Sequence, residues 1–542
     1  MTEVLPEARE AYRRREWRRA EELFTAAEGL AELDADDLHA FADASWWLGH
    51  IDESLGVSSR AYRRYIDEHH PRPAAMEALN LAYYLALRGD VSAASGWLGR
   101  AVRLLAHETD CPEQAFLVYA RDVEFALDGP DLDSVLAAAQ AVIEAGVRHD
   151  EPTLVALGLT GRGRGLIRQG KVAAGMAALD EAMTSSLRDG LSPDWVGNVY
   201  CNLMSACYEV ADVRRAREWT EAAVQWVDSF SAAVLFAGIC RVHRSQVLQS
   251  SGAWEEAEVE ALRVCTDVEH MAVGTAAEAH YQVGDLRRLR GDFAGAHEAY
   301  SRSHELGRDP QPGLALLHLA EGRVEAAASS IRSALIAETL NRPVRARLCA
   351  AQVEIALAAD DVDTACKADA ELTEIASAYG SSGLLALAFF VHGLVALKDG
   401  GAAEALPILR DACRRWRELD APYECARVRA VLAQVYDELG DTDAAEAERR
   451  VAEATFVRLG AVLDTRALSI RKGGAALPDG LTAREAEVLG LAARGKSNRQ
   501  IATSLVLSEK TVARHLSNIF TKINVSSRTE AAAYAFQHRL IR

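Results

Sequence analysis

The chain has 542 residues, nine cysteines and more acidic than basic side chains, with 79 Asp and Glu against 60 Lys and Arg. The cysteines are scattered and form no CxxC pair, which fits reduced thiols in a cytosol and argues against a disulfide framework. The first residues, MTEVLPEARE, contain no apolar stretch of the kind that a secretion signal needs, so we expect a cytoplasmic protein.

Residues 1–464 are predicted to be helical throughout, because their apolar positions recur with a helical period and show almost no strand-like alternation. Turn positions punctuate this segment at intervals of mostly about 40 residues. They lie near residues 49, 89, 129, 170, 211, 252, 291, 322, 360, 400 and 440. A fixed period of this length indicates stacked pairs of helices.

The same pattern of residue sizes surrounds many of these turns. A small residue lies seven positions before the turn glycine, others lie five and twelve after it, and a large apolar residue lies nine after it. Around Gly89 these are Ala82, Ala94, Ala101 and Leu98, and the pattern recurs around residues 170, 291, 322 and 400. Small residues let antiparallel helices touch, while the large one fills the gap to the next pair.

This pattern resembles the tetratricopeptide repeat, with helices longer than those of the usual unit of about 34 residues. The resemblance implies a curved solenoid of about eleven or twelve helix pairs. Solenoids of this kind present binding surfaces, so we expect an unknown protein or small-molecule partner whose identity the surface residues do not reveal.

Two features of the repeats suggest other sites at first. The apolar run from Leu384 to Leu397 is shorter than the roughly 20 residues of a membrane span and contains His392, so we predict a buried solenoid helix and no membrane association. His297 and His304 share one predicted helix face without an HExxH motif or nearby cysteines. We therefore predict no metal site and no cofactor.

Residues 465–477 are predicted to be a linker, because the stretch around it, residues 471–480, has flexible glycines before a proline. Beyond it the charge changes sign. Residues 481–542 hold ten Lys and Arg against four acids, a net charge of +6, whereas residues 1–480 carry a net charge of −25. This division indicates a basic domain that binds a polyanion, fused to an acidic body.

Residues 478–542 are predicted to form a small four-helix domain. Three capping boxes mark helix starts, at Thr482 with Glu485, Ser497 with Gln500, and Ser527 with Glu530, and Ser508 followed by Glu509 marks a fourth. The predicted helices cover residues 483–494, 498–505, 509–523 and 528–538. Only about three residues separate the second from the third, which is the helix-turn-helix arrangement.

The third of these helices has two different faces. Val512, Leu516, Ile519, Phe520 and Ile523 form one apolar stripe, so the opposite face is free to enter the major groove of DNA. Its arginine is the best candidate for a base contact, since a guanidinium can pair with guanine through two hydrogen bonds. The complete candidate DNA-binding set is Lys496, Asn498, Ser508, Lys510, Thr511, Ala513, Arg514, Ser517, Thr521 and Lys522. Lys496, Asn498, Lys510, Thr511 and Lys522 are expected at phosphates.

The segments LTAREAEVL from Leu481, GKSNRQIA from Gly495, LSEKTVARH from Leu507 and KINVSSRTE from Lys522 resemble the C-terminal helix-turn-helix of LuxR-type transcription regulators. The resemblance implies a DNA-binding output and a homodimer through the last helix, residues 528–538. Ala513 departs from the family, which often has a basic residue there. This departure places more of the expected base recognition on Arg514.

The residues Gly490 to Ser497 also match the P-loop pattern GxxxxGK[ST]. A P-loop needs a preceding strand and an irregular loop, whereas the residues before Gly490 have a helical period, so we predict no nucleotide site. No catalytic triad or paired-carboxylate cleft is recognisable, and the chain is not predicted to be an enzyme. The prediction is an all-α, sequence-specific DNA-binding transcription regulator with the repeats as sensing module; the alternative is a protein–protein interaction scaffold with a non-specific basic tail.

Overall fold

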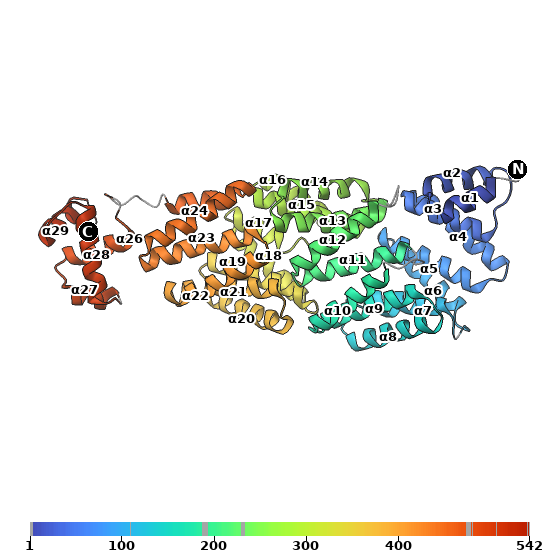
Figure 1. Ribbon diagram of the computed structural model, residues 1–542, viewed down its shortest axis with the longest axis horizontal. Helices are drawn as coiled ribbons and strands as arrows, with labels where there is room; N and C mark the ends of the chain where they lie inside the picture. Colours follow the sequence, from blue (N-terminus) through green and yellow to red (C-terminus); the bar gives the residue numbers. More distant parts are fainter. Residues whose placement is uncertain are drawn as a thin grey trace.

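The computed structural model describes residues 4–108, 110–186, 193–228, 234–472, 479, 481–505, 507–538 and 540. These residues contain helices and no strand, as the all-α prediction requires. Figure 1 shows an elongated molecule with the N-terminus at one end and the last four helices at the other.

The first half of the body is a continuous series of helices, interrupted once by a π-helical turn, η1. Their bounds are α1 Val4–Arg13, α2 Trp17–Glu28, α3 Ala35–Leu48, α4 Ile51–Asp67, α5 Pro71–Leu87, α6 Val91–Leu104, α7 Pro112–Val118, η1 Tyr119–Glu124, α8 Leu132–Arg148, α9 Pro152–Arg168, α10 Val172–Ser186, α11 Pro193–Glu209, α12 Val213–Asp228 and α13 Val234–Ser251.

The second half continues in the same manner up to the predicted linker. Its helices are α14 Trp254–Asp267, α15 Val273–Arg290, α16 Phe293–Glu305, α17 Gly313–Ala320, α18 Val324–Ala337, α19 Arg342–Ala358, α20 Val362–Tyr379, α21 Ser382–Asp399, α22 Ala402–Glu418, α23 Pro422–Leu439, α24 Thr442–Leu459 and α25 Val462–Lys472. The C-terminal domain contains α26 Ala483–Ala493, α27 Asn498–Leu505, α28 Glu509–Lys522 and α29 Arg528–Gln537.

The size pattern around the turns is explained by the packing within helix pairs. A Cβ atom added to Gly284 would lie 2.6 Å from Cδ1 of Tyr300, and one added to Gly393 would lie 2.5 Å from Cδ2 of Leu409. The small residue before a turn thus accepts the large residue that follows the turn. Most of the turn residues have a positive φ; at residue 211, where the sequence has Ala, φ is 55°.

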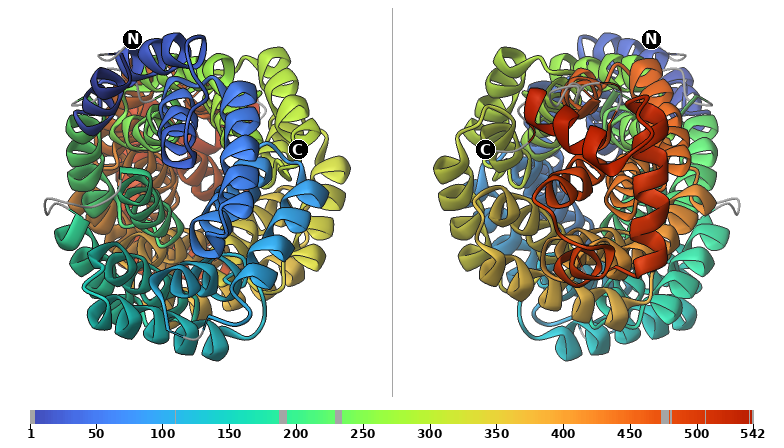
Figure 2. Two further views of the ribbon diagram at one scale, coloured as in Figure 1. Left: turned by 90° about the vertical axis from the view of Figure 1, so that its right-hand side faces the viewer. Right: turned by 90° about the vertical axis from the view of Figure 1, so that its left-hand side faces the viewer.

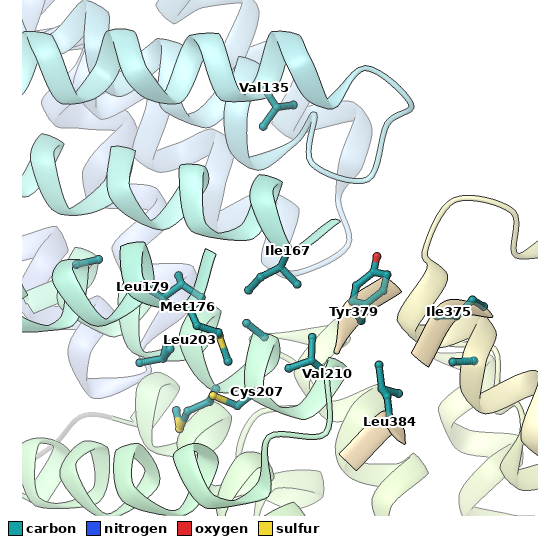
Figure 3. Packing of buried hydrophobic residues seen from close by; sticks show 14 of the residues in the cluster. Val135, Ile167, Met176, Leu179, Leu203, Cys207, Val210, Ile375, Tyr379 and Leu384 are labelled. Carbon is teal, nitrogen blue, oxygen red and sulfur yellow. The ribbon is translucent and has the colours of Figure 1, made fainter. Parts of the chain in front are cut away.

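The chain of helix pairs winds into a superhelix. Seen down the long axis of the molecule, the helices form a ring (Figure 2). Successive superhelical turns touch. The hydroxyl of Ser381 donates a hydrogen bond to the carbonyl of Val210, at 2.6 Å and 171 residues away in sequence. One core cluster accordingly combines side chains from two successive superhelical turns. It includes Ile167 and Val210 from one turn and Leu384 from the other (Figure 3).

Two parts of the structure bear on particular sequence predictions. Helix α21 is long and apolar enough to cross a membrane by length and composition, but half of its apolar window is buried in the protein, as expected for a solenoid helix. Helix α25 continues through residue 472, so the first part of the predicted linker is helical. The reason is that Leu468 is buried in a cluster with Leu286 of α15 and Phe456 of α24. Residues 473–478 lie outside the described residues.

Candidate nucleic-acid interface and interior cavity

The helices of the C-terminal domain begin where their caps predict. Thr482 and Glu485 form a reciprocal capping box: the Glu485 backbone N–H donates to the Thr482 hydroxyl at 3.2 Å, and the Thr482 N–H donates to the Glu485 carboxylate at 2.8 Å. The hydroxyl of Ser508 accepts the N–H of Thr511 at 3.1 Å at the start of α28. These bonds satisfy backbone groups that a helix start leaves unpaired.

Helix α28 divides into the two predicted faces. Val512, Leu516 and Ile519 are buried in a core that also contains Val488 of α26 and Ile501 of α27. The opposite face is exposed to solvent and carries Lys510, Ala513, Arg514, Ser517 and Thr521. An arginine, a lysine and two hydroxyl groups on one exposed helix face can donate to the acceptors of base edges and phosphates.

Three of the residues predicted at phosphates have partners inside the domain. Lys496 Nζ donates to the Ser504 hydroxyl at 3.1 Å, and Asn498 accepts a hydrogen bond from Arg528 Nη1 at 2.9 Å. Lys522 forms an ion pair with Glu485, with 2.7 Å between Nζ and Oε2. These side chains hold α27, α28 and α29 in place. If they also contact phosphates, they do so in addition to these contacts within the domain.

Sequence reasoning missed two arginines that position the interface. Arg528 bonds Asn498 and also the carbonyl of Lys496, and thereby ties the start of α29 to the start of α27. Arg484 donates to the carbonyl of Leu505 at 2.8 Å, at the end of α27. Both contacts join residues more than twenty positions apart, so no local pattern could have found them.

The Glu485 carboxylate is held in its charged form. Burial alone raises the pKa of this group, but the ammonium group of Lys522 and the N–H of Thr482 outweigh burial and leave the pKa below its ordinary value. The side chain is 6% exposed. A buried carboxylate therefore links the first helix of the domain to the end of α28.

The region that matches the P-loop pattern is helical, as predicted. Gly490 lies inside α26, and Gly495 has a φ of 81° just beyond the end of that helix. Its neighbour Ser497 accepts the N–H of Gln500 at 3.3 Å at the start of α27. Gly495 thus follows the end of one helix and Ser497 begins the next.

The repeats contain a second candidate site, a cavity inside the superhelix. Its volume is about 280 Å³, and it adjoins another of about 340 Å³ that shares Gln249, Asp285, Glu424 and Arg427 with it. The apolar part of the first cavity's lining comes from widely separated helices: Met204, Cys207, Val213, Val247, Leu384, Leu387 and Trp416. The superhelical winding brings these side chains together.

Arg347 is the cation in this lining that has no carboxylate partner among the described residues. Its guanidinium lies 4.0 Å from the centre of the Tyr208 ring and donates to the carbonyl of Tyr208. Arg427, by contrast, is paired with Glu354 at 2.5 Å. Burial raises the pKa of Glu424 and lowers the pKa of His243, which shifts both groups toward their uncharged forms. The net character of the first cavity is apolar with an unpaired positive charge.

His297 and His304 do not meet in the structure. His297 instead bonds Glu321, with 2.9 Å between Nε2 and Oε1, and lies beside His318. Arg323 also contacts the Glu321 carboxylate at 3.3 Å. His297, His318 and Glu321 thus place one ligand atom each within 4.8 Å of one another, and Arg323 shares the Glu321 carboxylate.

Comparison with known proteins matches the C-terminal domain. Residues 479–535 match the family model described as "Bacterial regulatory proteins, luxR family". The chain is 43% identical over 100 residues to the response regulator protein VraR of Staphylococcus epidermidis, covering 18% of this chain and 47% of that protein. It is 50% identical over 70 residues to VraR of Staphylococcus aureus, covering 13% and 34%. The chain thus spans less than half the length of these curated relatives.

Solved structures resemble the repeat region weakly. A Rap protein complexed with competence and sporulation factor has a TM-score of 0.40 and 11% identity, covering 71% of this chain and 98% of that one. The quorum sensor NprR from B. thuringiensis has a TM-score of 0.34 and 12% identity, covering 70% and 97%.

Proposed function

Because the C-terminal domain belongs to the LuxR family of bacterial regulatory proteins, we propose that the chain is a sequence-specific DNA-binding transcription regulator. The observation that carries this proposal is the exposed face of α28, set on a core that buries the opposite face of the same helix. A helix presented in this way fits the major groove, where all four base pairs are distinguishable.

The exposed face divides into reading and positioning groups. Arg514 is the base-reading residue, since its guanidinium can donate two parallel hydrogen bonds to guanine, while Ala513 offers only an apolar contact such as a thymine methyl group. Ser517 and Thr521 extend the same face by one and two helical turns. Lys510, Thr511 and Ser508, at the start of α28, contact phosphates and set the register.

Helix α29 is the proposed dimer contact. Its residues Ala531 and Ala535 face the domain core, whereas Phe536 is 64% exposed. An exposed phenylalanine on a helix rich in alanine suits close packing against a second copy. Two copies would place two α28 helices about 34 Å apart, one turn of DNA.

The repeats, residues 1–464 in this proposal, form the sensing module, and the interior cavity is its ligand site. The unpaired Arg347 and the apolar lining favour a small organic anion with an apolar body. A cavity of about 280 Å³ lies near the lower end of the size range of small-molecule sites. Such a ligand would bridge helices from separate superhelical turns and alter their relative position. In this proposal the chain acts in the cytoplasm and is not an enzyme.

The test is selection of duplexes from a randomised library by the full chain at two salt concentrations. We expect an enriched, two-fold-symmetric sequence with half-sites one helical turn apart. Binding that depends on salt but enriches no sequence would contradict the proposal and favour the alternative, a scaffold with a non-specific basic tail. Repeating the selection with Arg514→Ala assigns any preference to α28.

A further inference from the structure

Cys413 of α22 and Cys425 of α23 lie side by side, with 3.6 Å between their Sγ atoms. A disulfide bond has a length of about 2.05 Å, so the two sulfur atoms need to approach by only about 1.5 Å to form one. The two helices are consecutive and antiparallel, and a loop of three residues joins them. This short connection keeps the two sulfur atoms next to each other.

The surroundings of this pair favour one thiolate and one thiol. The hydrogen bond between the two sulfur atoms and the guanidinium of Arg429 outweigh burial and lower the pKa of Cys425 to about 6. The same contact, together with burial, raises the pKa of Cys413. Arg429 is itself held by Glu448 of α24, at 2.6 Å. A thiolate is the nucleophilic form of cysteine, so Cys425 is the reactive member of the pair.

A second close pair lacks these features. Cys201 is hydrogen-bonded to Cys240 inside the core, and no cation lowers the pKa of Cys201, which this contact and burial raise. Cys240 is 2% exposed. Cys201, like Cys425, is partly accessible to solvent, so the cation is what distinguishes the two pairs. Two thiols therefore lie close together at both pairs, but a neighbouring cation that lowers a thiol pKa is found at Cys413 and Cys425.

We propose that Cys413 and Cys425 form a reversible intramolecular disulfide in response to a peroxide. The Cys425 thiolate attacks one oxygen of hydrogen peroxide; an S–O bond forms, the O–O bond breaks, and the departing hydroxide takes up a proton to become water. The sulfur of Cys413 then attacks the sulfur of the Cys425 sulfenic acid. An S–S bond forms, the S–O bond breaks, and the hydroxyl group leaves with the Cys413 proton as a second water. Two thiols lose two electrons in total, and the peroxide gains them.

The position of the bond connects it to the interior cavity. Trp416, one helical turn after Cys413, and Glu424, next to Cys425, both line that cavity. The disulfide would cross-link the two helices that contribute these side chains. This inference concerns the thiols alone and does not depend on the proposed DNA-binding function.

The experiment uses the full chain, reduced, freed of reductant without oxygen, and then exposed to one equivalent of hydrogen peroxide. Free thiols are alkylated, and the protein is digested with trypsin without reduction. We expect the peptide of residues 411–414, containing Cys413, to be linked to that of residues 418–427, containing Cys425. The link should disappear on treatment with dithiothreitol.

Matched variants separate this bond from general oxidation. Cys366→Ser changes another partly accessible cysteine and should leave the link unaffected. Cys413→Ser removes the resolving thiol, so we expect a sulfenic acid on Cys425 that dimedone traps. Retention of all nine thiols after peroxide, or a link between Cys201 and Cys240 in place of the expected one, overturns the proposal. Because mapping of the unsubstituted chain decides the outcome, a poorly folded variant does not affect it.

Discussion

The hydroxyl of Tyr379 donates a hydrogen bond to the backbone carbonyl of Arg168, with 3.1 Å between the oxygens, although 211 residues separate the two positions. This contact joins the end of α20 to the end of α9, one superhelical turn apart. Repeat proteins are commonly stabilised by neighbouring repeats alone. Here contacts between turns add a second source of stability and close the wall around the interior cavity.

A substitution at Gly383 tests how much the contacts between superhelical turns stabilise the protein. It is the second residue of α21 and lies against Ala211, so that an added Cβ atom would come within 2.5 Å of the Ala211 Cβ. We expect Gly383→Ala to destabilise the protein by about 1–3 kcal/mol, because the backbone of two superhelical turns must move apart. The measurement is the midpoint of thermal unfolding.

Gly274 provides a matched control, since it is the second residue of α15 and has open space where its Cβ would lie. Gly274→Ala should leave the midpoint unchanged or raise it, because alanine is favoured over glycine in a helix by about 0.5–1 kcal/mol. Equal effects of the two substitutions would show that the contact between turns adds nothing to stability.

Arg514 and Lys510 should respond differently to truncation, although both lie on the exposed face of α28. Arg514→Ala should reduce discrimination at one base position by about 1–3 kcal/mol. Lys510→Ala should weaken binding to all sequences alike and reduce the salt dependence by about one phosphate contact. Affinities of the full chain for a set of single-base operator variants, measured at several salt concentrations, distinguish the two. If Lys510→Ala lost base preference and Arg514→Ala kept it, the assigned roles of the two residues would be reversed.

Local signals explain which parts of the molecule were predictable from sequence. The caps at Thr482, Ser508 and Ser527 lie within four residues of the groups that they satisfy, so the helix starts could be predicted. The repeats could be predicted because the turn glycines lie within twelve residues of the small and large side chains that pack around them.

Other features depend on residues far apart in sequence. The bond between Arg528 and Asn498 spans 30 residues, and no periodicity signals it. The cavity combines Arg347 with Tyr208, and their meeting depends on superhelical pitch, which is the sum of many small rotations between repeats. The proximity of Cys413 and Cys425 likewise required the packing of two helices.

Phe536 tests the proposed dimer. Phe536→Glu introduces a charge on the exposed side of α29, away from the buried Ala531 and Ala535, so the fold of the domain should persist. We expect the variant to bind a duplex with two half-sites no more tightly than a duplex with one. Sedimentation of the protein–DNA complex gives the number of chains bound, and two chains per duplex in the variant would contradict a dimer contact at this residue.

Arg347 tests the proposed ligand site. The probe is 8-anilinonaphthalene-1-sulfonate, which combines an apolar body with one negative charge and becomes fluorescent in apolar surroundings. We expect Arg347→Gln to weaken its binding by roughly tenfold or more, since a hydrogen bond to a charged group contributes about 1.5–3 kcal/mol. Arg323→Gln, at a surface arginine that is 56% exposed, is the control and should bind as the parent chain does. Unchanged affinity in Arg347→Gln would place the anion elsewhere.

The ion pair between Glu485 and Lys522 makes the stability of the C-terminal domain dependent on pH. Because the pKa of Glu485 is lower in the folded domain than its unfolded value of about 4.3, its contribution is fully present above that value and is lost as the pH falls through the folded pKa. We expect amide exchange in α26, corrected for the intrinsic effect of pH, to accelerate on acidification below about pH 4.3.

The substitution Glu485→Gln should accelerate this amide exchange already at neutral pH, by an amount equivalent to about 1.5–3 kcal/mol. It should also flatten the pH dependence of the exchange rate. Glu487→Gln serves as the comparison, because Glu487 is 54% exposed and its pair with Arg484 is a surface ion pair worth at most about 1 kcal/mol. If both variants exchange alike at neutral pH, the buried pair does not stabilise the domain, and α28 is held by its apolar core alone.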